Sequence, residues 1–459
     1  MVNYHLAILM TFAAIGSGYT YGQQIPQTLG QLWPKVEKTY VGLKAKSAAI
    51  ESAQLDVRAV KTNRLPHVKL QAQNTYGTFE GAAGAFFPQP GFFNVSGSTT
   101  GTAGSSVAAN TFGSATAEWE IFSFGKLKKE YQAAQTIAEK RDSERAASIL
   151  ELKKSLAERY ITLLYDQVKL NWNNKNVLRL NEIRKLTTGL SKAGIRPAAD
   201  SLLALSSYNQ SLGKNERFTG LKNAALIKLT ELYAEENMDY SSSLIHFLEP
   251  VAYPTKHLAT VYESHPILTA LEHQADYFYY HSEIQRRAAL PSIRILGGYA
   301  IRGSGIHPSG LASGRWKDGF SNTTANYLFG IGATWNITDL KSNSLRRQVY
   351  RKDAESIRHQ LSQYQLAMQS DLSAVTAKIL QQYKQIEKSS IAIQQAEEAY
   401  EMYLARYKSG LIALSEVLQI RQLLESAENS HIEAAKQYWM LVVHQSALTT
   451  DFDYLFNNL

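Results

Sequence analysis

The sequence predicts an α+β membrane protein built from two successive copies of one unit, each made of a helix, a β-hairpin, a long helix and a closing helix. Two observations carry this prediction. Short motifs recur along the chain at a nearly constant offset. The hydrophobic period also switches between about 3.6 residues and two residues, in the same order in both halves.

Composition excludes several classes of protein. The chain has 459 residues, of which 44% are hydrophobic and 19% charged, so it can bury a large core and is not disordered. It has no cysteine, which excludes disulfides, thiolate metal sites and cysteine nucleophiles. The net charge of +8 is scattered along the chain and names no partner. No apolar run reaches the roughly 18 residues of a membrane-spanning helix, so a membrane form would not be a helical bundle.

Residues 1–22 are expected to be a cleaved signal peptide. Leu6 to Ile15 form a compact apolar run, and small and polar residues follow it up to Gly22. The segment before the run has no Lys or Arg, so an ordinary buried N-terminal helix is the alternative.

Internal repetition divides the rest of the chain into residues 23–250 and 251–459. Leu65-Pro66 recurs as Leu290-Pro291 at an offset of 225 residues. At an offset of 216 residues, Trp119-Glu120-Ile121 recurs as Trp335-Asn336-Ile337, and Lys192-Ala193-Gly194 recurs as Lys408-Ser409-Gly410. Chance matches do not keep register in this way, so we infer a tandem repeat.

Each copy is expected to contain one β-hairpin and one long helix. The hairpins are predicted at about 66–124 and 291–338, where apolar residues alternate with polar or small ones. Gly-rich loops join their strands, and the first loop holds Phe86-Phe87 and Phe92-Phe93, whose role stays open. The long helices are predicted at about 126–188 and 341–409, which lack Gly and Pro. The second would be ~100 Å long and needs a coiled-coil partner.

Four strands of about ten residues with one apolar face suit a transmembrane β-barrel, although an ordinary soluble sheet gives the same alternation. The export signal and the Trp and Tyr residues of the strands favour the membrane. Four strands cannot close a barrel, and lipid does not tolerate open sheet edges. Several chains are therefore expected to share one barrel, continued into water by a wall of long helices.

The order and spacing of these motifs resemble the TolC-type outer membrane efflux proteins, also called outer membrane factors. The resemblance rests on the repeated Leu-Pro and Trp-x-Ile motifs and on the turn motifs Lys192 to Ile195 and Tyr407 to Leu411. It implies a homotrimer with a shared twelve-stranded barrel in the outer membrane and a coiled-coil tunnel in the periplasm. It also implies a periplasmic adaptor protein that links the tunnel to an inner-membrane pump.

By this resemblance the two turns form a periplasmic tip that meets the adaptor. The implied contact residues are Lys192, Gly194, Ile195, Lys408, Gly410 and Leu411. Independently of the family, glycines at 189, 194 and 410 permit the left-handed backbone that reverses a helix, and Pro197 suits the first turn of the next helix. The alternative is that these glycines only turn the chain.

Glu416 and Gln419 are the candidates for a tunnel constriction. The family has an Asp-Val-Leu-Asp run after the second turn, whose carboxylates ring the closed tunnel mouth. Here the run is Glu416-Val417-Leu418-Gln419, so one acid is kept and the other is Gln. The alternative role of Glu416 is that of a first-turn acid favoured by the helix dipole, like Asp200.

The function expected is a passive exit duct of a tripartite efflux or secretion system. An envelope-spanning coiled-coil scaffold without channel activity is the runner-up, and an outer-membrane enzyme is the third reading. The chain is not expected to be an enzyme, because nucleotide-binding, serine-hydrolase and metalloprotease motifs are missing. No cofactor, metal or nucleic acid is expected: His265, His273 and His281, spaced by eight, do not share one helix face.

Overall fold

The computed structural model describes residues 28–78, 107–232, 241–251, 264–307, 309 and 311–459. The predicted signal peptide and the phenylalanine-rich loop lie outside these residues. The chain divides into two compact units. The helical unit takes Met1–Tyr40, Glu151–Leu258 and Ser373–Leu459, and the sheet unit takes Val41–Leu150 and Ala259–Leu372. This spatial division draws on both halves of the chain, so the repeat boundary at 250 stays a prediction.

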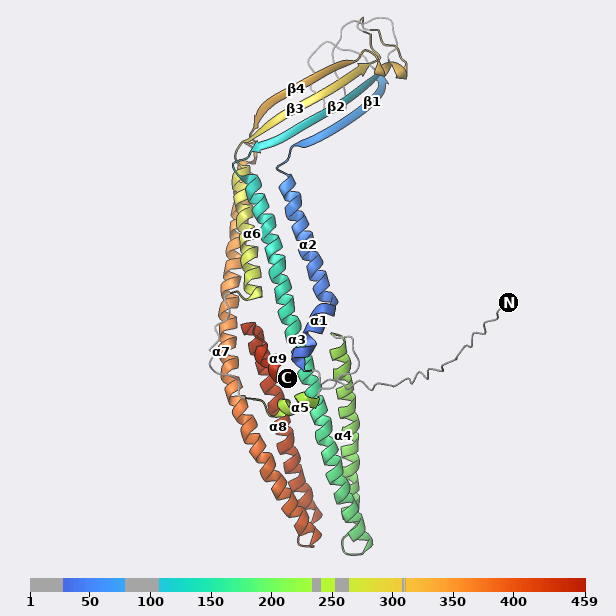
Figure 1. Ribbon diagram of the computed structural model, residues 1–459, viewed down its shortest axis with the longest axis vertical. Helices are drawn as coiled ribbons and strands as arrows, with labels where there is room; N and C mark the ends of the chain where they lie inside the picture. Colours follow the sequence, from blue (N-terminus) through green and yellow to red (C-terminus); the bar gives the residue numbers. More distant parts are fainter. Residues whose placement is uncertain (1–27, 79–106, 233–240, 252–263, 308, 310) are drawn as a thin grey trace, which may run out of the picture. The chain divides into compact units, whose positions relative to one another are not determined.

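The sheet unit contains one antiparallel sheet with the strand order β1-β2-β3-β4 (Figure 1). The strands are β1 (His67–Thr78), β2 (Val107–Phe122), β3 (Ser292–Ser304) and β4 (Thr324–Thr334). Both hairpins therefore form where the alternation predicts them. Strand β2 begins at Val107, eight residues before the clear alternation that starts at Ala115. The sequence does not reveal this earlier start, because residues 107–114 mix small, polar and apolar side chains on both faces.

The two faces of the sheet differ in polarity. The register pairs Leu70 with Ala115, Ala115 with Tyr299 and Tyr299 with Tyr327, which places four apolar or aromatic positions in one row across the sheet. Many side chains of this face are exposed: Leu70 is 78% exposed and Tyr327 is 87% exposed. The opposite face is more polar: it carries Lys69, Glu118, Glu120 and Arg294, with Arg294 paired to both glutamates. By the register, Phe112, Leu296 and Leu328 are its large apolar residues among the described ones.

At the end of each hairpin that is nearer to the helices, a tryptophan bonds to the segment that connects a helix to the first strand. The indole Nε1 of Trp119 donates to the carbonyl of Arg64 at 2.8 Å, and that of Trp335 donates to the carbonyl of Ala289 at 3.0 Å. In both cases the acceptor lies just before a Leu-Pro pair. In each hairpin, the tryptophan of one recurring motif thus bonds to the residue just before the other.

Helices α2 (Val41–Thr62) and α6 (Pro266–Ala288) precede β1 and β3 in the sheet unit. The two longest helices, α3 (Lys126–Lys192) and α7 (Asp339–Lys408), have segments in both units. Helix α3 runs four residues beyond the predicted end at 188, because Gly189 stays helical instead of reversing the chain. The prediction of a left-handed Gly189 is therefore wrong, whereas α7 agrees with its predicted range to within two residues.

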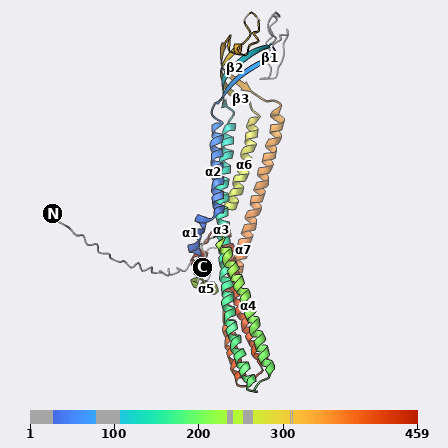
Figure 2. The same cartoon turned by 90° about the vertical axis from the view of Figure 1, so that its right-hand side faces the viewer.

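Within its described residues, the helical unit consists of two antiparallel helix pairs and three short helices. Helix α4 (Ala198–Thr230) returns along α3, and α8 (Leu414–Thr449) returns along α7 (Figures 1 and 2). The short helices are α1 (Leu29–Thr39), α5 (Ser241–Leu248) and α9 (Asp453–Asn458). Among the described helices, none is both long and apolar enough to cross a membrane.

Candidate functional site at the two helical turns

The turns from α3 to α4 and from α7 to α8 have the same backbone geometry. Gly194 has φ +71° and Gly410 has φ +84°, so both are left-handed. The amide of Ile195 donates to the carbonyl of Leu190, and the amide of Leu411 donates to that of Arg406, each at 3.0 Å. Together with the amides of the two glycines, these bonds form the Schellman motif that ends a helix.

The side chains of the predicted contact residues point into solvent in this chain. Ile195 is 66% exposed and Leu411 is 70% exposed, and Lys192 and Lys408 are exposed as well. Each turn therefore carries one lysine and one large apolar side chain on its surface. Apolar groups exposed at equivalent positions of two neighbouring turns are typical of an interaction surface. The docking of an adaptor at these residues stays a prediction.

Two polar contacts tie the turns to each other. A guanidinium nitrogen of Arg196 donates to the carbonyl of Ile412 at 2.9 Å. The hydroxyl of Tyr407 donates to Oδ2 of Asp200 at 3.2 Å, and the guanidinium of Arg196 lies 4.9 Å from the centroid of the Tyr407 ring. The helix pair α3/α4 is thus fastened to the pair α7/α8 at their ends.

The Tyr407 contact persists across the physiological pH range. Burial, together with the neighbouring Asp200 carboxylate, raises the pKa of Tyr407 to about 12. Because the folded pKa lies above the ordinary value, the contribution to stability is complete below about pH 10 and is lost only as the pH rises toward 12.

An apolar cluster lies behind these contacts. It contains Ile183 of α3, Ala204 of α4, Leu404 and Tyr407 of α7, and Val417 of α8, all nearly or fully buried. Burial of this kind is the main source of stability where the four helices meet. The turns therefore combine an apolar interior with a few polar contacts at its edge.

Glu416 has a structural role at the start of α8. Its Oε1 accepts a hydrogen bond from the backbone amide of Ala413, the residue before the helix, at 3.2 Å. This contact is the one expected of an acid at the third position of a helix. Glu416 and Gln419 are exposed and three residues apart, so they share one face of α8. The described contacts fit the first-turn role and leave a constriction at these residues a proposal.

Acidic side chains of α8 bind basic and aromatic side chains of α3 and α4 along the helix. Glu428 accepts two bonds from Arg179, both at 2.9 Å, and one from the indole of Trp172 at 2.8 Å. Glu425 pairs with Lys214 at 2.6 Å. Burial by itself would lower the pKa of Arg179, but its pairing with Glu428 outweighs burial and raises that pKa.

Further along α8, polar side chains surround a buried lysine. Lys169 is 8% exposed, bonds to Asn429 and lies 3.3 Å from Glu433. Its ammonium also lies 5.0 Å from the centroid of Trp172. We call the contacts of Glu425, Glu428 and Glu433 with α3 and α4 the α8 ladder.

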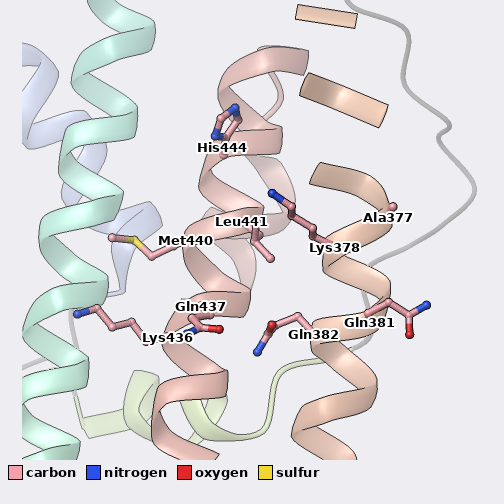
Figure 3. A pocket seen from close by; sticks show the side chains of 9 residues that line it. All are labelled: Ala377, Lys378, Gln381, Gln382, Lys436, Gln437, Met440, Leu441 and His444. Carbon is pink, nitrogen blue, oxygen red and sulfur yellow. The ribbon is translucent and has the colours of Figure 1, made fainter. Parts of the chain in front are cut away.

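A groove of about 760 Å³ lies between α7 and α8 in the helical unit (Figure 3). Gln382 and Gln437 face each other across it, and Lys378 and His444 line it further along. Lys436 also lines it, and its ammonium lies 4.0 Å from the centroid of the Tyr165 ring on α3. The groove is lined by no carboxylate and no catalytic pair. Within the described residues, no group of three His, Cys, Asp or Glu side chains is placed to hold a metal ion.

A comparison with models of protein families identifies the family of this chain. The family model described as outer membrane efflux protein matches residues 41–235 and 258–440, which together are most of the chain. The chain belongs to the outer membrane efflux protein family. Membership locates the protein in the outer membrane with its helical part in the periplasm, and the family is one of channels and not of enzymes.

Solved structures of other outer membrane channels share the fold. The CmeC channel of Campylobacter jejuni is 14% identical with a TM-score of 0.73, over 98% of this chain and 93% of CmeC. VceC of Vibrio cholerae is 15% identical with a TM-score of 0.71, over 93% of this chain and 97% of VceC. The open state of MtrE of Neisseria gonorrhoeae is 16% identical with a TM-score of 0.68, over 92% of this chain and 89% of MtrE. Among functionally curated proteins, none matches the sequence significantly.

The contacts between the turns are the part of the site that sequence reasoning missed. Tyr407 enters the sequence argument only as part of a turn motif and Asp200 only as a helix-dipole acid, while Arg196 does not enter it at all. Their pairing links residues 207 and 216 positions apart. The one available signal is that Arg196 and Ile412 occupy equivalent positions of the repeat.

Replacing the two glycines near the end of α3 by alanine is expected to change the stability of the protein in opposite directions. Gly194→Ala is expected to destabilise the protein by about 1–2 kcal/mol, because the left-handed backbone at 194 is unfavourable for a residue with a Cβ atom. Gly189→Ala is expected to stabilise it by about 0.5–1 kcal/mol, because Gly189 is helical. Space does not differ, since a Cβ at either position meets nothing within 4 Å. Unfolding midpoints in detergent provide the measurement, and equal shifts would refute the assignment.

The α8 ladder gives a second prediction. Glu428→Gln is expected to cost about 3 kcal/mol, because it leaves the largely buried Arg179 without its main counter-charge. Glu397→Gln is the matched control and should cost less than about 1 kcal/mol, because Glu397 is 57% exposed and lies 3.5 Å from the same guanidinium. Urea unfolding in detergent measures both. If the two variants lose equal stability, the ladder does not depend on Glu428.

Proposed function

We propose that the protein is a homotrimeric exit duct, with four strands from each copy in one shared barrel and the long helices continuing it as a tunnel. The observation that carries the proposal is the sheet itself. Among the described residues, β1 and β4 each pair along one edge only, and one face of the sheet is apolar and exposed. Lipid requires every backbone group to be paired, so β4 of one copy must pair with β1 of the next.

The proposed mechanism is a gate at the helical turns. The contacts of Arg196 and Tyr407, with the apolar cluster behind them, join the two turns and would hold such a gate shut. The duct opens when the ends of α7 and α8 move away from those of α3 and α4. The α8 ladder binds the same helix pairs further from the turns, so we place the moving part at the turn side of Arg179.

The proposed partner is a periplasmic adaptor that docks on the two turns and joins an inner-membrane pump. Ile195 and Leu411, with Lys192 and Lys408 beside them, give such a partner an apolar contact rimmed by positive charge. Gly194 and Gly410 leave room for close approach of its backbone. Conduction through the duct is passive, and the pump supplies the energy.

The oligomeric state and the current test the proposal together. Protein extracted from membranes in mild detergent is expected to migrate as a trimer that heating converts to a monomer, and to conduct ions in planar bilayers. A detergent-independent, soluble protein without current would favour the scaffold reading instead.

Removing the hydroxyl of Tyr407 is expected to loosen the gate. Tyr407→Phe keeps the ring in the cluster but deletes its bond to Asp200, worth about 1 kcal/mol per protomer, or roughly a fivefold shift toward the open state. Mean current in planar bilayers should rise accordingly. Tyr403→Phe is the control, because Tyr403 packs against the same cluster. Equal currents for wild type and Tyr407→Phe would place the gate elsewhere.

Glu416→Gln separates the two roles of Glu416. Glutamine retains an oxygen that accepts the bond from Ala413, so the start of α8 is kept while the charge is lost. If three Glu416 carboxylates surround the duct, cation preference should fall in bilayer recordings. An unchanged reversal potential, measured in a salt gradient, would leave Glu416 with its helix-starting role alone.

A further inference from the structure

The loop between β3 and β4 lies against a defined face of the sheet. Residues 311–321, which we call the β3–β4 strap, contain a short 3-10 helix from Trp316 to Phe320. The carbonyl of Gly314 accepts a bond from the hydroxyl of Tyr76 at 2.8 Å. The carbonyl of Ser321 accepts one from the amide of Ser304 at 2.8 Å. The strap is therefore fastened to both β1 and β3.

The register identifies the covered face as the apolar one. Tyr76 pairs with Ala109, and the pairing runs without a break to Leu70 opposite Ala115. Side chains alternate along a strand, so Tyr76, Ala109, Leu70 and Ala115 share one face. Ala109 is fully buried there. A Cβ added to Gly319 would lie 2.8 Å from that of Ala109, so the strap packs directly on this face.

The opposite face is lined differently at the same end of the sheet. Asn110 accepts a bond from the hydroxyl of Ser304 at 2.9 Å, and the guanidinium of Arg302 lies 5.9 Å from the Phe112 ring. These residues alternate with Ala109, Thr111 and Gly303, so they belong to the polar face. None of these contacts involves the strap.

The outer surface of the strap combines aromatic rings with positive charge. Trp316 is 54% exposed and Phe320 is 53% exposed, and their rings lie edge to face at 5.5 Å. Arg315 and Lys317 flank Trp316 and are exposed. Asp318, at 3.1 Å from Arg315, is the one acid of the strap. Tryptophan and basic residues side by side are typical of the headgroup layer of a membrane.

We propose that the β3–β4 strap lies on the lipid side of the sheet and binds anionic, phosphate-bearing lipid headgroups through Arg315, Lys317 and the ring of Trp316. The strap therefore does not cover the duct. This inference rests on the proposed function in one respect, namely that the apolar face of the sheet meets lipid. It adds a lipid-binding surface to that function.

The absence of cysteine from the chain makes a site-specific test direct. Single-cysteine variants of the full-length trimer carry an environment-sensitive dye in vesicles of phosphatidylcholine with phosphatidylglycerol. Phe320→Cys reports on the strap and leaves Arg315, Trp316 and Lys317 in place. Phe329→Cys reports on the apolar face, because Phe329 pairs with Gly297 of β3, which lies on the same face as Tyr299. Asn326→Cys reports on the polar face, because Asn326 pairs with Ala300, which lies on the other face.

Quenchers carried on lipid headgroups should quench the dye at 320, and quenchers carried deeper on lipid chains should quench the dye at 329. Aqueous iodide should quench the dye at 326. If the dye at 329 is quenched by lipid but the dye at 320 only by iodide, the strap proposal is overturned and the barrel stands. If lipid quenches neither dye, the barrel itself fails.

Lipid charge provides the second arm. The dye at 320 should be quenched about twofold more by spin-labelled phosphatidylglycerol than by spin-labelled phosphatidylcholine at equal mole fraction. Adding Arg315→Gln and Lys317→Gln should abolish that preference and leave headgroup quenching itself in place. Equal quenching by the two lipids before these substitutions would overturn the binding of anionic headgroups.

Discussion

Unpaired backbone groups at the edges of the sheet are the constraint on which the rest of the molecule depends. A strand edge exposes amides and carbonyls that water can satisfy and lipid cannot. The exposed apolar face of this sheet favours lipid over water as its surroundings, whereas the unpaired edges of β1 and β4 could lie in lipid only if further strands covered them. The proposed shared barrel meets both demands, because in it identical copies pair edge to edge and their long helices lie around a common axis.

In the proposed duct, the helical unit forms a junction that has to close and to open. Its polar contacts fall into two groups. Those at the turns are few and partly solvent-accessible, so they can be exchanged for water or for a partner at small cost. Those of the α8 ladder include the largely buried, two-pronged Arg179–Glu428 pair, whose disruption leaves a charge without compensation. The contacts between the two helix pairs are therefore expected to be weaker at the turns than at Arg179 and Glu428.

Much of this architecture follows from the sequence because its determinants are periodic. Alternation places the four strands, and the absence of Gly and Pro places α3 and α7. The exceptions are local. Gly189 does not end a helix, because a glycine only permits reversal and the hydrogen bonds around Gly194 decide where it occurs. The pairings of Arg196 and Tyr407 cannot be predicted from composition or period, because they depend on how four helix ends are packed. The strap on the apolar face is equally hard to predict, since short polar loops carry no periodic signal.

The acceptor chosen by Arg196 has an evolutionary consequence. Its guanidinium binds the main-chain carbonyl of Ile412 and not a side chain. Every amino acid presents that carbonyl, so this bond does not depend on the side chain at 412, which is constrained only by its burial in the apolar cluster. Exposed positions of the second turn, such as Leu411, can therefore change during evolution while the attachment between the two helix pairs is inherited unchanged.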